Sequence, residues 1–262
     1  MTKSLDSLTV LVSGGAGYIG SHAVLALRDH GIKTIVIDNL TTGFRWAVPE
    51  DVPLIEGDVG DLAWVSSQIQ DHDIGAILHF AGSVVVPESV SNPLKYYENN
   101  TSHSRALIEA AVTSGVRHFI FSSTAATYGI PDQVPVTEDA PKQPINPYGM
   151  SKLMTEHMLA DVAKAHVLAL KALVEAPTEC LTMNCGYGRG FSVTEVLDAV
   201  DRVADVKINR KFEGRRAGDP DALTADNRRI RARLPWTPAY EDLDTIVTHA
   251  LAWEKELQRR AL

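Results

Sequence analysis

The fold is decided by the stretch LTVLVSGGAGYIG at residues 8–20. It begins as an apolar run of strand length, Leu8–Ser13, passes through a run of glycines and continues as an amphipathic segment as far as Gly31. A strand, a glycine-rich turn and a helix in this order are typical of a dinucleotide site. Glycines let backbone N–H groups approach a pyrophosphate at the positive end of the helix dipole. The stretch therefore predicts that Gly14 to Gly20 bind a dinucleotide.

The same alternation of short β-branched runs and longer amphipathic stretches continues to about Lys164. It predicts an α/β fold, a Rossmann-type doubly wound parallel sheet. Two helix starts are explicit, because Asn92-Pro93 and Asn146-Pro147 each place an Asn cap before a Pro at the first helical position. The further runs that we interpret as strands are residues 33–38, 52–58, 75–82 and 117–123.

Beyond Pro177 the character of the chain changes. We predict one short strand at residues 179–186, a helix from Ser192, a basic stretch at residues 210–233 and a final helix that contains tryptophan. The sequence thus predicts two domains, a nucleotide-binding Rossmann domain at residues 1–176 and a smaller substrate-binding lobe at residues 177–262.

Composition narrows the class of protein. The 262 residues are 45% hydrophobic and carry a net charge of −8, which argues against a dedicated nucleic-acid binder because phosphate backbones demand a basic surface. The N-terminal apolar run is too short for a secretory or membrane-spanning segment, so we expect a cytoplasmic protein without membrane contact. Cys180 and Cys185 form no CxxC pair, and we expect two reduced thiols rather than a metal site or a disulfide.

Two acidic residues close strands in the nucleotide-binding part. Asp38 ends the second run 18 residues after Gly20, where a carboxylate hydrogen-bonds a ribose 2′-hydroxyl and repels a 2′-phosphate. This position favours NAD over NADP. Asp58 ends the third run and is either a residue that recognises adenine or a turn-forming Asp at a strand end.

A candidate catalytic set follows the fifth run. Tyr148 and Lys152 lie four residues apart on the helix that begins at Pro147, so their side chains share one face. A phenol has an ordinary pKa of about 10, and a neighbouring ammonium favours the phenolate, which makes Tyr148 a general base. Thr124 ends the sequence Ser122-Ser123-Thr124 at the edge where open α/β sheets bind ligands, and we expect it to hydrogen-bond the reacting hydroxyl.

Six motifs in this order carry a family resemblance: GGAGYIG, DNL, HFAG, YYENN, FSSTAATYG and YGMSK. Together they resemble the extended short-chain dehydrogenase/reductase family, in its epimerase branch. The resemblance implies a bound NAD and a UDP-sugar substrate, with epimerisation at C4 of a UDP-hexose (UDP-glucose or UDP-galactose) through a transient 4-keto sugar. Ala125 and Ala126 stand where related dehydratases carry acidic residues, which favours epimerisation over elimination of water.

The resemblance also implies the site residues. Thr124, Tyr148 and Lys152 would be catalytic, and Arg216 with Asp219 would join Thr124 and Tyr148 in binding the substrate. A guanidinium suits a pyrophosphate because it donates paired, charge-assisted hydrogen bonds, although Arg216 also fits a solvated arginine-rich face. The implied cofactor residues are Gly14, Gly17, Tyr18, Ile19, Gly20, Asp38, Asn39, Asp58, Val59, Phe80, Ala81, Gly82, Asn99, Ser122, Tyr148 and Lys152.

The family further implies a homodimer, formed when the helices near residues 93–114 and 147–164 of two copies pack as a four-helix bundle. Apolar residues on these helices are candidates for the seam, and burial inside one copy is the competing interpretation. They are Leu107, Ala110, Ala111, Leu153, Met154 and Met158.

The chain departs from the family after the YGMSK helix. A sixth parallel strand, its nucleotide loop, further helices and a seventh strand are missing, a gap of roughly 60–75 residues. The join falls at Ala165–Val167 and predicts one continuous helix from Pro147 to Ala176. It also predicts that the fifth strand is an edge with unpaired backbone groups.

Two other functions stay open. Leu223 occupies a position that borders the sugar pocket in the family, which leaves room for an NAD-dependent reductase or epimerase of another nucleotide sugar. The missing segment leaves room for a truncated NAD-binding protein with impaired catalysis, because lost polar contacts and lost orientation each cost several kcal/mol.

Overall fold

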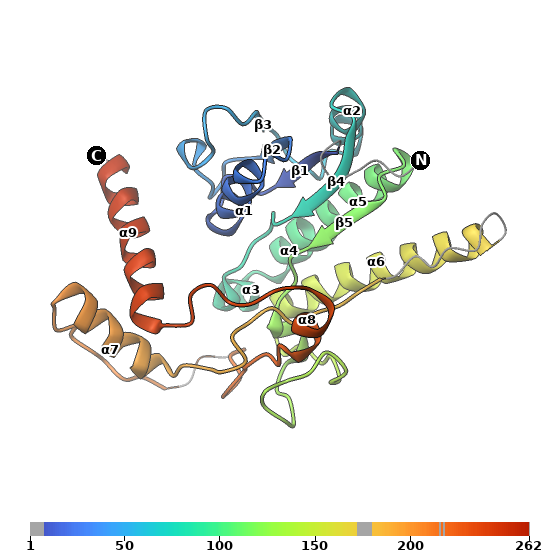
Figure 1. Ribbon diagram of the computed structural model, residues 1–262. Helices are drawn as coiled ribbons and strands as arrows, with labels where there is room; N and C mark the ends of the chain where they lie inside the picture. The colour runs from blue at the N-terminus through green and yellow to red at the C-terminus, as the bar shows by residue number, and fades with distance from the viewer. Residues whose placement is uncertain (1–7, 172–179, 215, 217, 262) are drawn as a thin grey trace. The chain divides into compact units, whose positions relative to one another are not determined.

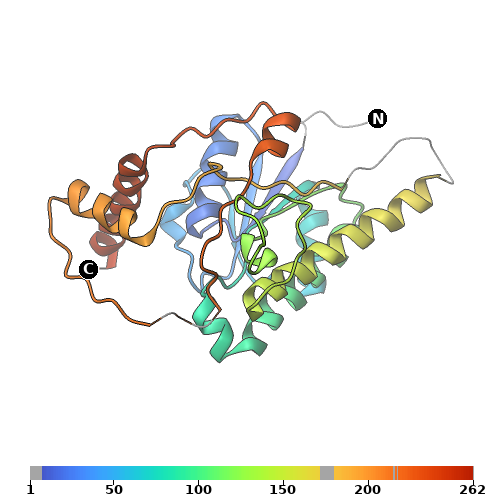
Figure 2. The same cartoon turned by 90° about the horizontal axis from the view of Figure 1, so that it is seen from below.

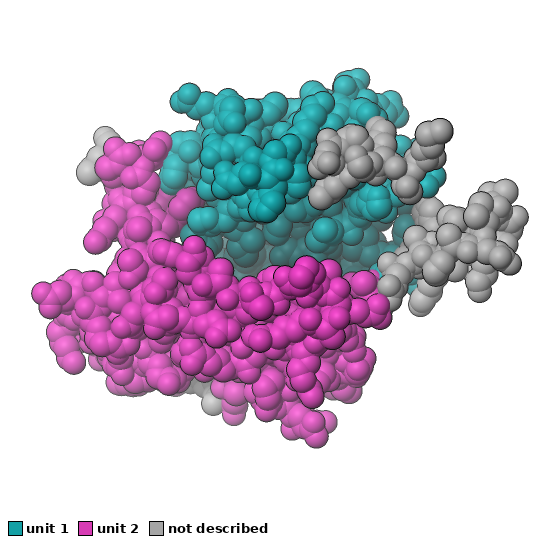
Figure 3. Space-filling model, in the orientation of Figure 1, with its two compact units in different colours: residues 1–129, 144–180 teal, residues 130–143, 181–262 magenta. Residues whose placement is uncertain are grey.

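The computed structural model describes residues 8–171, 180–214, 216 and 218–261. Contacts along the chain divide it into two compact units (Figure 3). The first unit holds residues 1–129 and 144–180, and the second holds residues 130–143 and 181–262. Residues 130–143, which the sequence placed with the nucleotide-binding part, thus group with the C-terminal residues.

The first unit is built on a five-stranded parallel sheet in the order β3-β2-β1-β4-β5 (Figure 1). This confirms the predicted α/β fold. Since β2 and β4 flank β1 on opposite sides, the strand order reverses at β1, and open α/β sheets bind ligands beyond the carboxyl ends of the strands at such a point. The strands are β1 (Thr9–Ser13), β2 (Thr34–Asp38), β3 (Leu54–Glu56), β4 (Ile74–His79) and β5 (His118–Phe121).

Helices cover both faces of this sheet because its strands alternate apolar side chains above and below. One core cluster joins Leu11 and Ile77 of the sheet to Leu107, and a second joins Val10 and Val12 to Val24. The first lies under α2 and α5 and the second under α1. The elements are α1 (Tyr18–Asp29), the 3₁₀ turn η2 (Arg45–Ala47), α2 (Leu62–Asp71), α3 (Val86–Ser91), α4 (Pro93–Tyr96), the π-helical turn η3 (Tyr97–Ser102), α5 (His103–Thr113), the 3₁₀ turn η4 (Ala125–Tyr128) and α6 (Pro147–Lys171).

Strand β5 is an edge, as predicted. It pairs with β4, and within the described ranges no strand pairs with its other side. Ile120 is 62% exposed, whereas every residue of β1 and β2 is buried. The join at residues 165–167 lies inside α6, which Figures 1 and 2 show as one unbroken helix. The last predicted helical residues, 172–176, lie outside the described residues.

The predicted dimer seam is largely wrong. Leu107, Ala110 and Ala111 face the sheet inside the first core cluster, and Leu153 is also buried. These side chains therefore pack within one copy, which is the competing interpretation of burial inside the monomer. Met154 is 40% exposed.

The second unit contains α7 (Val193–Ala204), α8 (Arg228–Arg233) and α9 (Leu243–Ala261), the last carrying Trp253. Ser192 and Glu195 cap α7 reciprocally, which confirms the predicted helix start. The strand predicted at residues 179–186 is wrong, since residues 180–186 form neither strand nor helix. Side chains satisfy this backbone instead, because the N–H of Asn184 donates to the carboxylate of Glu138 over 2.8 Å.

No helix in the described part of the chain is long and apolar enough to cross a membrane.

Candidate active site

The glycine turn between β1 and α1, which we expect to bind a pyrophosphate, packs tightly on the neighbouring backbone. Gly14 adopts φ +72°, and a Cβ there would lie 2.5 Å from the backbone nitrogen of Ala81. A Cβ on Gly20 would lie 2.1 Å from the carbonyl oxygen of Gly14. Gly17 is the N-cap of α1 and offers no side-chain cap, so the first turn of the helix presents its N–H groups to a ligand. Side chains on Gly14 and Gly20 would therefore collide with the neighbouring backbone and distort the turn.

The carboxylate of Asp38 holds this turn. Its Oδ2 accepts a hydrogen bond from the N–H of Ala16 over 2.9 Å, and its Oδ1 accepts one from the N–H of Leu40 over 2.8 Å. Each carboxylate oxygen has two lone pairs, so each retains an acceptor position after these bonds. Asp38 can therefore shape the turn and accept a ribose hydroxyl at the same time, which fits NAD.

Asn39 and Asp58, both predicted to contact the cofactor, contact each other. Asn39 Nδ2 donates to Asp58 Oδ2 over 2.9 Å, and the N–H of Gly60 donates to Asp58 Oδ1 over 2.8 Å. Asp58 thus also has the turn-forming role that the sequence left open. The side chain of Val59 is buried in the core cluster of α2 and α5, which leaves only its backbone for a ligand.

Beyond β4 the chain is fixed to β1, since the N–H groups of Phe80 and Ala81 both donate to the carbonyl of Ser13, over 2.9 and 3.1 Å. The next residues meet the π-helical turn η3. Asn99 Nδ2 donates to Ser83 Oγ over 2.9 Å, and the N–H of Ser83 donates to Asn100 Oδ1 over 2.7 Å. π-Helical turns occur frequently at functional sites.

Asn100 was missed by the sequence reasoning, which singled out only Asn99. It is 1% exposed, and its amide donates to the carbonyl of Ser83 over 3.0 Å and to Ser151 Oγ over 3.1 Å. A Cβ on Gly82, where φ is +153°, would lie 2.9 Å from Asn100 Oδ1. Asn100 therefore ties the loop after β4 to α6 beneath the predicted cofactor residues.

His79 extends this buried polar network and was also missed. Its Nδ1 lies 2.6 Å from Ser13 Oγ and its Nε2 lies 2.8 Å from Ser104 Oγ, and the Ser104 hydroxyl donates to the carbonyl of Asn100 over 2.6 Å. Burial, with a smaller contribution from the charge of Lys152, lowers the pKa of His79 to about 3. The imidazole is thus neutral and links β1, β4, α5 and η3.

The candidate catalytic residues lie at the start of α6. Asn146 Oδ1 accepts the N–H of Gly149 over 2.7 Å and so caps the helix. Lys152 is 5% exposed, and its Nζ lies 4.3 Å from the centre of the Phe121 ring. Burial lowers the pKa of Lys152 to about 8, against the opposing effect of the Glu156 carboxylate.

Tyr148 and Thr124 belong to neighbouring segments. The Tyr148 ring stands edge-on to Tyr96, with 6.3 Å between ring centres. Thr124 begins η4 and its Oγ1 accepts the N–H of Ala126 over 3.2 Å. A Cβ on Gly149 would lie 2.5 Å from the carbonyl oxygen of Ala126, so the turn after Thr124 rests directly on the start of α6. The N–H of Ser122 donates to the carbonyl of His79 over 3.1 Å.

The predicted substrate residues Arg216 and Asp219 lie in the second unit. Arg216 Nε donates to Asp219 Oδ2 over 2.8 Å, and the Arg216 side chain is 70% exposed. The structure therefore brings this pair together as an exposed ion pair.

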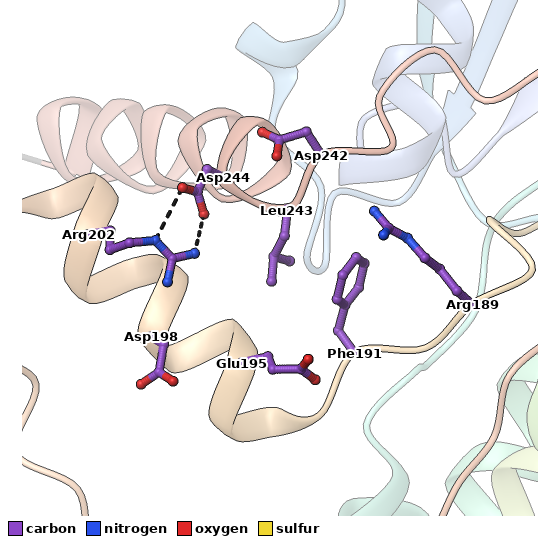
Figure 4. Close-up of a pocket in the computed structure, with 8 residues that line it drawn as sticks. All are labelled: Arg189, Phe191, Glu195, Asp198, Arg202, Asp242, Leu243 and Asp244. Carbon is purple, nitrogen blue, oxygen red and sulfur yellow. Dashed lines mark hydrogen bonds and ion pairs between the residues drawn. The ribbon is translucent and has the colours of Figure 1, made fainter.

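A pocket in the second unit shares no residue with the predicted site (Figure 4). Charged groups of its lining have partners: Arg202 binds both carboxylate oxygens of Asp244, and Asp198 accepts from Arg210, outside the lining, over 2.7 Å. Arg189 donates to the carbonyl of Glu241. We interpret it as a structural depression between α7 and α9. Its lining is Arg189, Phe191, Glu195, Asp198, Arg202, Asp242, Leu243 and Asp244.

A glycine turn at the reversal of a parallel sheet, an acid that ends β2, and a Tyr–Lys pair on one helix define a dinucleotide-dependent protein of the short-chain dehydrogenase/reductase type. Comparison with known proteins narrows this class. Residues 10–200 match the NAD dependent epimerase/dehydratase family, and the chain belongs to that family.

Relatives agree in sequence and in structure. The chain is 40% identical to the UDP-glucose 4-epimerase of Azospirillum brasilense, over 98% of this chain and 95% of the relative. It resembles the UDP-Glc/GlcNAc 4-epimerase of Campylobacter jejuni with a TM-score of 0.83 and 34% identity, over 95% and 100% of the two chains. It resembles the UDP-glucose 4-epimerase of Bifidobacterium longum, solved with NAD+ and UDP, with a TM-score of 0.86 and 26% identity, over 95% and 98%.

The alignment lengths also show that the relative has residues that this chain lacks. The alignment with the Azospirillum relative has 331 positions and this chain has 262 residues, so at least 69 positions (331 less 262) have no counterpart here. The range of roughly 60–75 missing residues stays a prediction, as does their place near residues 165–167.

Proposed function

We propose that this chain catalyses NAD-dependent epimerisation at C4 of a UDP-hexose and interconverts UDP-glucose and UDP-galactose. The observation that carries the proposal is the buried Lys152, one turn after Tyr148 on α6, in a chain 40% identical to a UDP-glucose 4-epimerase. The chemistry requires a proton acceptor at a sugar hydroxyl and a bound hydride acceptor, and the first unit offers residues suited to both.

The residues around the carboxyl ends of β1, β2 and β4 fit NAD by shape and by charge. Asp38 would hold the adenosine ribose, and its negative charge disfavours a 2′-phosphate. NAD, when bound, supplies a reversible hydride acceptor for C4 of the sugar. The residues that we propose to hold it are Gly14, Gly17, Tyr18, Ile19, Gly20, Asp38, Asn39, Asp58, Val59, Phe80, Ala81, Gly82, Asn99, Ser122, Tyr148 and Lys152.

The proton chemistry belongs to the chain itself. Tyr148 removes the proton of the 4′-hydroxyl and later returns it, while the Lys152 ammonium favours the phenolate and binds ribose. Thr124 hydrogen-bonds the reacting hydroxyl. Arg216 and Asp219 hold the nucleotide half of the substrate, where the guanidinium binds the pyrophosphate.

The test is an assay that separates epimerisation from net oxidation. Supplied with UDP-galactose, the protein should yield UDP-glucose without net NADH, because hydride returns to the sugar in each turnover. Stoichiometric accumulation of NADH would instead support a dehydrogenase or reductase. Turnover of a different nucleotide sugar, but not of UDP-galactose, would support the alternative that Leu223 leaves open, an epimerase of another nucleotide sugar.

A second candidate function rests on the gap and on the exposed edge of β5. If the absent positions include walls of the substrate site, the chain binds NAD and turns over no UDP-sugar. Calorimetric titration with NAD, followed by the epimerase assay on protein of verified 28.5 kDa mass, distinguishes the two candidates. Binding of NAD with normal turnover excludes the impaired form.

We also propose that the protein acts in the cytoplasm as a homodimer that associates through α5 and α6. Val112 and Met154 support this surface, since both are apolar and respectively 37% and 40% exposed on these helices. A monomer in sedimentation at micromolar concentration would reject the homodimer.

A further inference from the structure

Glu156 lies on α6 one turn beyond Lys152, and neither the motifs nor the family resemblance gave it a role. Tyr148, Lys152 and Glu156 follow one another at intervals of four residues, which places all three on one face of the helix. The first two are the proposed base and its cationic neighbour. The third is an acid one turn beyond the buried ammonium.

The carboxylate of Glu156 also reaches the turn after β5. The hydroxyl of Ser123 donates a short hydrogen bond to Glu156 Oε1. Ser123 stands between Ser122, whose N–H is fixed to the carbonyl of His79, and Thr124, which begins η4. Glu156 therefore connects α6 to the segment that carries Thr124. The close contact between Gly149 and Ala126 lies at the other end of this turn.

The groups that face Lys152 explain why the charge of the Glu156 carboxylate matters to it. From β5 the Phe121 ring faces the ammonium, and from β4 the buried His79 faces it in its neutral form. From α6 itself come Tyr148 and Glu156. Burial lowers the pKa of Lys152, and the negative charge of Glu156 raises it.

Glu88 and Lys95, on the neighbouring helices α3 and α4, are paired with each other. Glu88 of α3 accepts hydrogen bonds from Lys95 and, over 2.8 Å, from the Tyr96 hydroxyl of α4. Tyr96, in turn, is the ring that packs against Tyr148. The Glu88 carboxylate is thus occupied by its own partners, and the anion that acts on Lys152 is Glu156.

We propose that Glu156 is a positioning residue for the epimerase chemistry, whose carboxylate places a negative charge one turn from Lys152 on α6 and, through Ser123, fixes the turn of Thr124 against that helix. The proposal rests on the proposed function for its catalytic meaning. The electrostatic and mechanical parts of the role involve different atoms, so two substitutions separate them.

Glu156→Gln removes the charge and keeps an amide oxygen that can accept from Ser123. Ser123→Ala removes the hydrogen bond and keeps the charge. Both are compared with the parent by NMR titration of ¹³C-labelled lysine in protein without NAD or substrate, with the Lys152 signal assigned by its absence in Lys152→Arg. Circular dichroism establishes that each variant is folded.

Without the anion the ammonium is less favoured, so Lys152 in Glu156→Gln should lose its proton about one pH unit lower than in the parent. The alkaline limb of kcat/KM should fall at correspondingly lower pH. Ser123→Ala should leave the midpoint unchanged and lower kcat. The proposal is overturned if Glu156→Gln titrates like the parent, or if Ser123→Ala shifts the midpoint as far as Glu156→Gln.

If Glu156→Gln does not fold, the same titration is made with Glu156→Asp. The shorter side chain withdraws the charge from Lys152, so a lower midpoint supports the proposal and an unchanged one overturns it. The titration needs no turnover. A parent protein that is inactive on UDP-galactose would therefore refute the proposed function, and the titration would still decide how Glu156 acts on Lys152.

Discussion

At the scale of single residues, the proposal that Tyr148 is the general base can be tested directly. Tyr148→Phe removes the acid/base hydroxyl and keeps the ring that packs against Tyr96. Turnover of UDP-galactose should fall by about 10²–10⁴-fold, and the Kd for NAD from calorimetry should stay near that of the parent. Full activity in this variant would refute the assignment of the base.

Asp38 is the second single residue to test, because we propose that it binds the adenosine ribose of NAD. In Asp38→Asn the amide must point a donor at one of two backbone N–H groups, and one acceptor for the ribose is lost. Hydrogen bonds to charged groups contribute about 1.5–3 kcal/mol, so NAD affinity should fall by roughly 10–100-fold. The matched control is Asp51→Asn, which removes an exposed acid and should bind NAD as the parent does. Equal losses in both variants would contradict the role of Asp38.

At the scale of elements, the two Asn-Pro motifs differ although their sequences match. Asn146 accepts the N–H of Gly149, whereas the side chain of Asn92 makes no capping hydrogen bond to α4. Asn146→Ala should therefore lower the free energy of unfolding by about 1 kcal/mol or more, and Asn92→Ala should cost much less. Urea unfolding of the two variants at one pH measures the difference. Comparable losses would show that Asn92 also caps through its side chain.

Elements with strong local patterns were the predictable ones. The alternation of apolar runs predicted all five strands, and Ser192 with Glu195 marked the start of α7. The π-helical turn and the irregular segment at residues 180–186 were not predictable, because distant partners decide them. Asn100 bonds to Ser151, and Asn184 bonds to Glu138. The role of a buried polar side chain depends on such contacts, which is also why His79 was missed.

At the scale of the whole molecule, the cofactor should stabilise the first unit. NAD binds the folded sheet and not the unfolded chain, so NAD at 100 times its Kd should raise the free energy of unfolding by about 2.7 kcal/mol. Urea unfolding followed by a signal from the first unit, with and without NAD, checks this. If NAD leaves the free energy of unfolding unchanged, the five-stranded sheet alone does not form the site.

The order of the strands has a consequence for coding sequences. β1 lies at the centre with β2 and β4 beside it, and β5 lies at the rim. In the described part of the chain no strand of the sheet follows β5, so removal in frame of codons that lie after β5 breaks no pairing among these five strands. Removal of β4 would instead part β5 from β1 and divide the sheet. A gene with this strand order can thus lose codons downstream of β5 and keep every pairing of the five-stranded sheet.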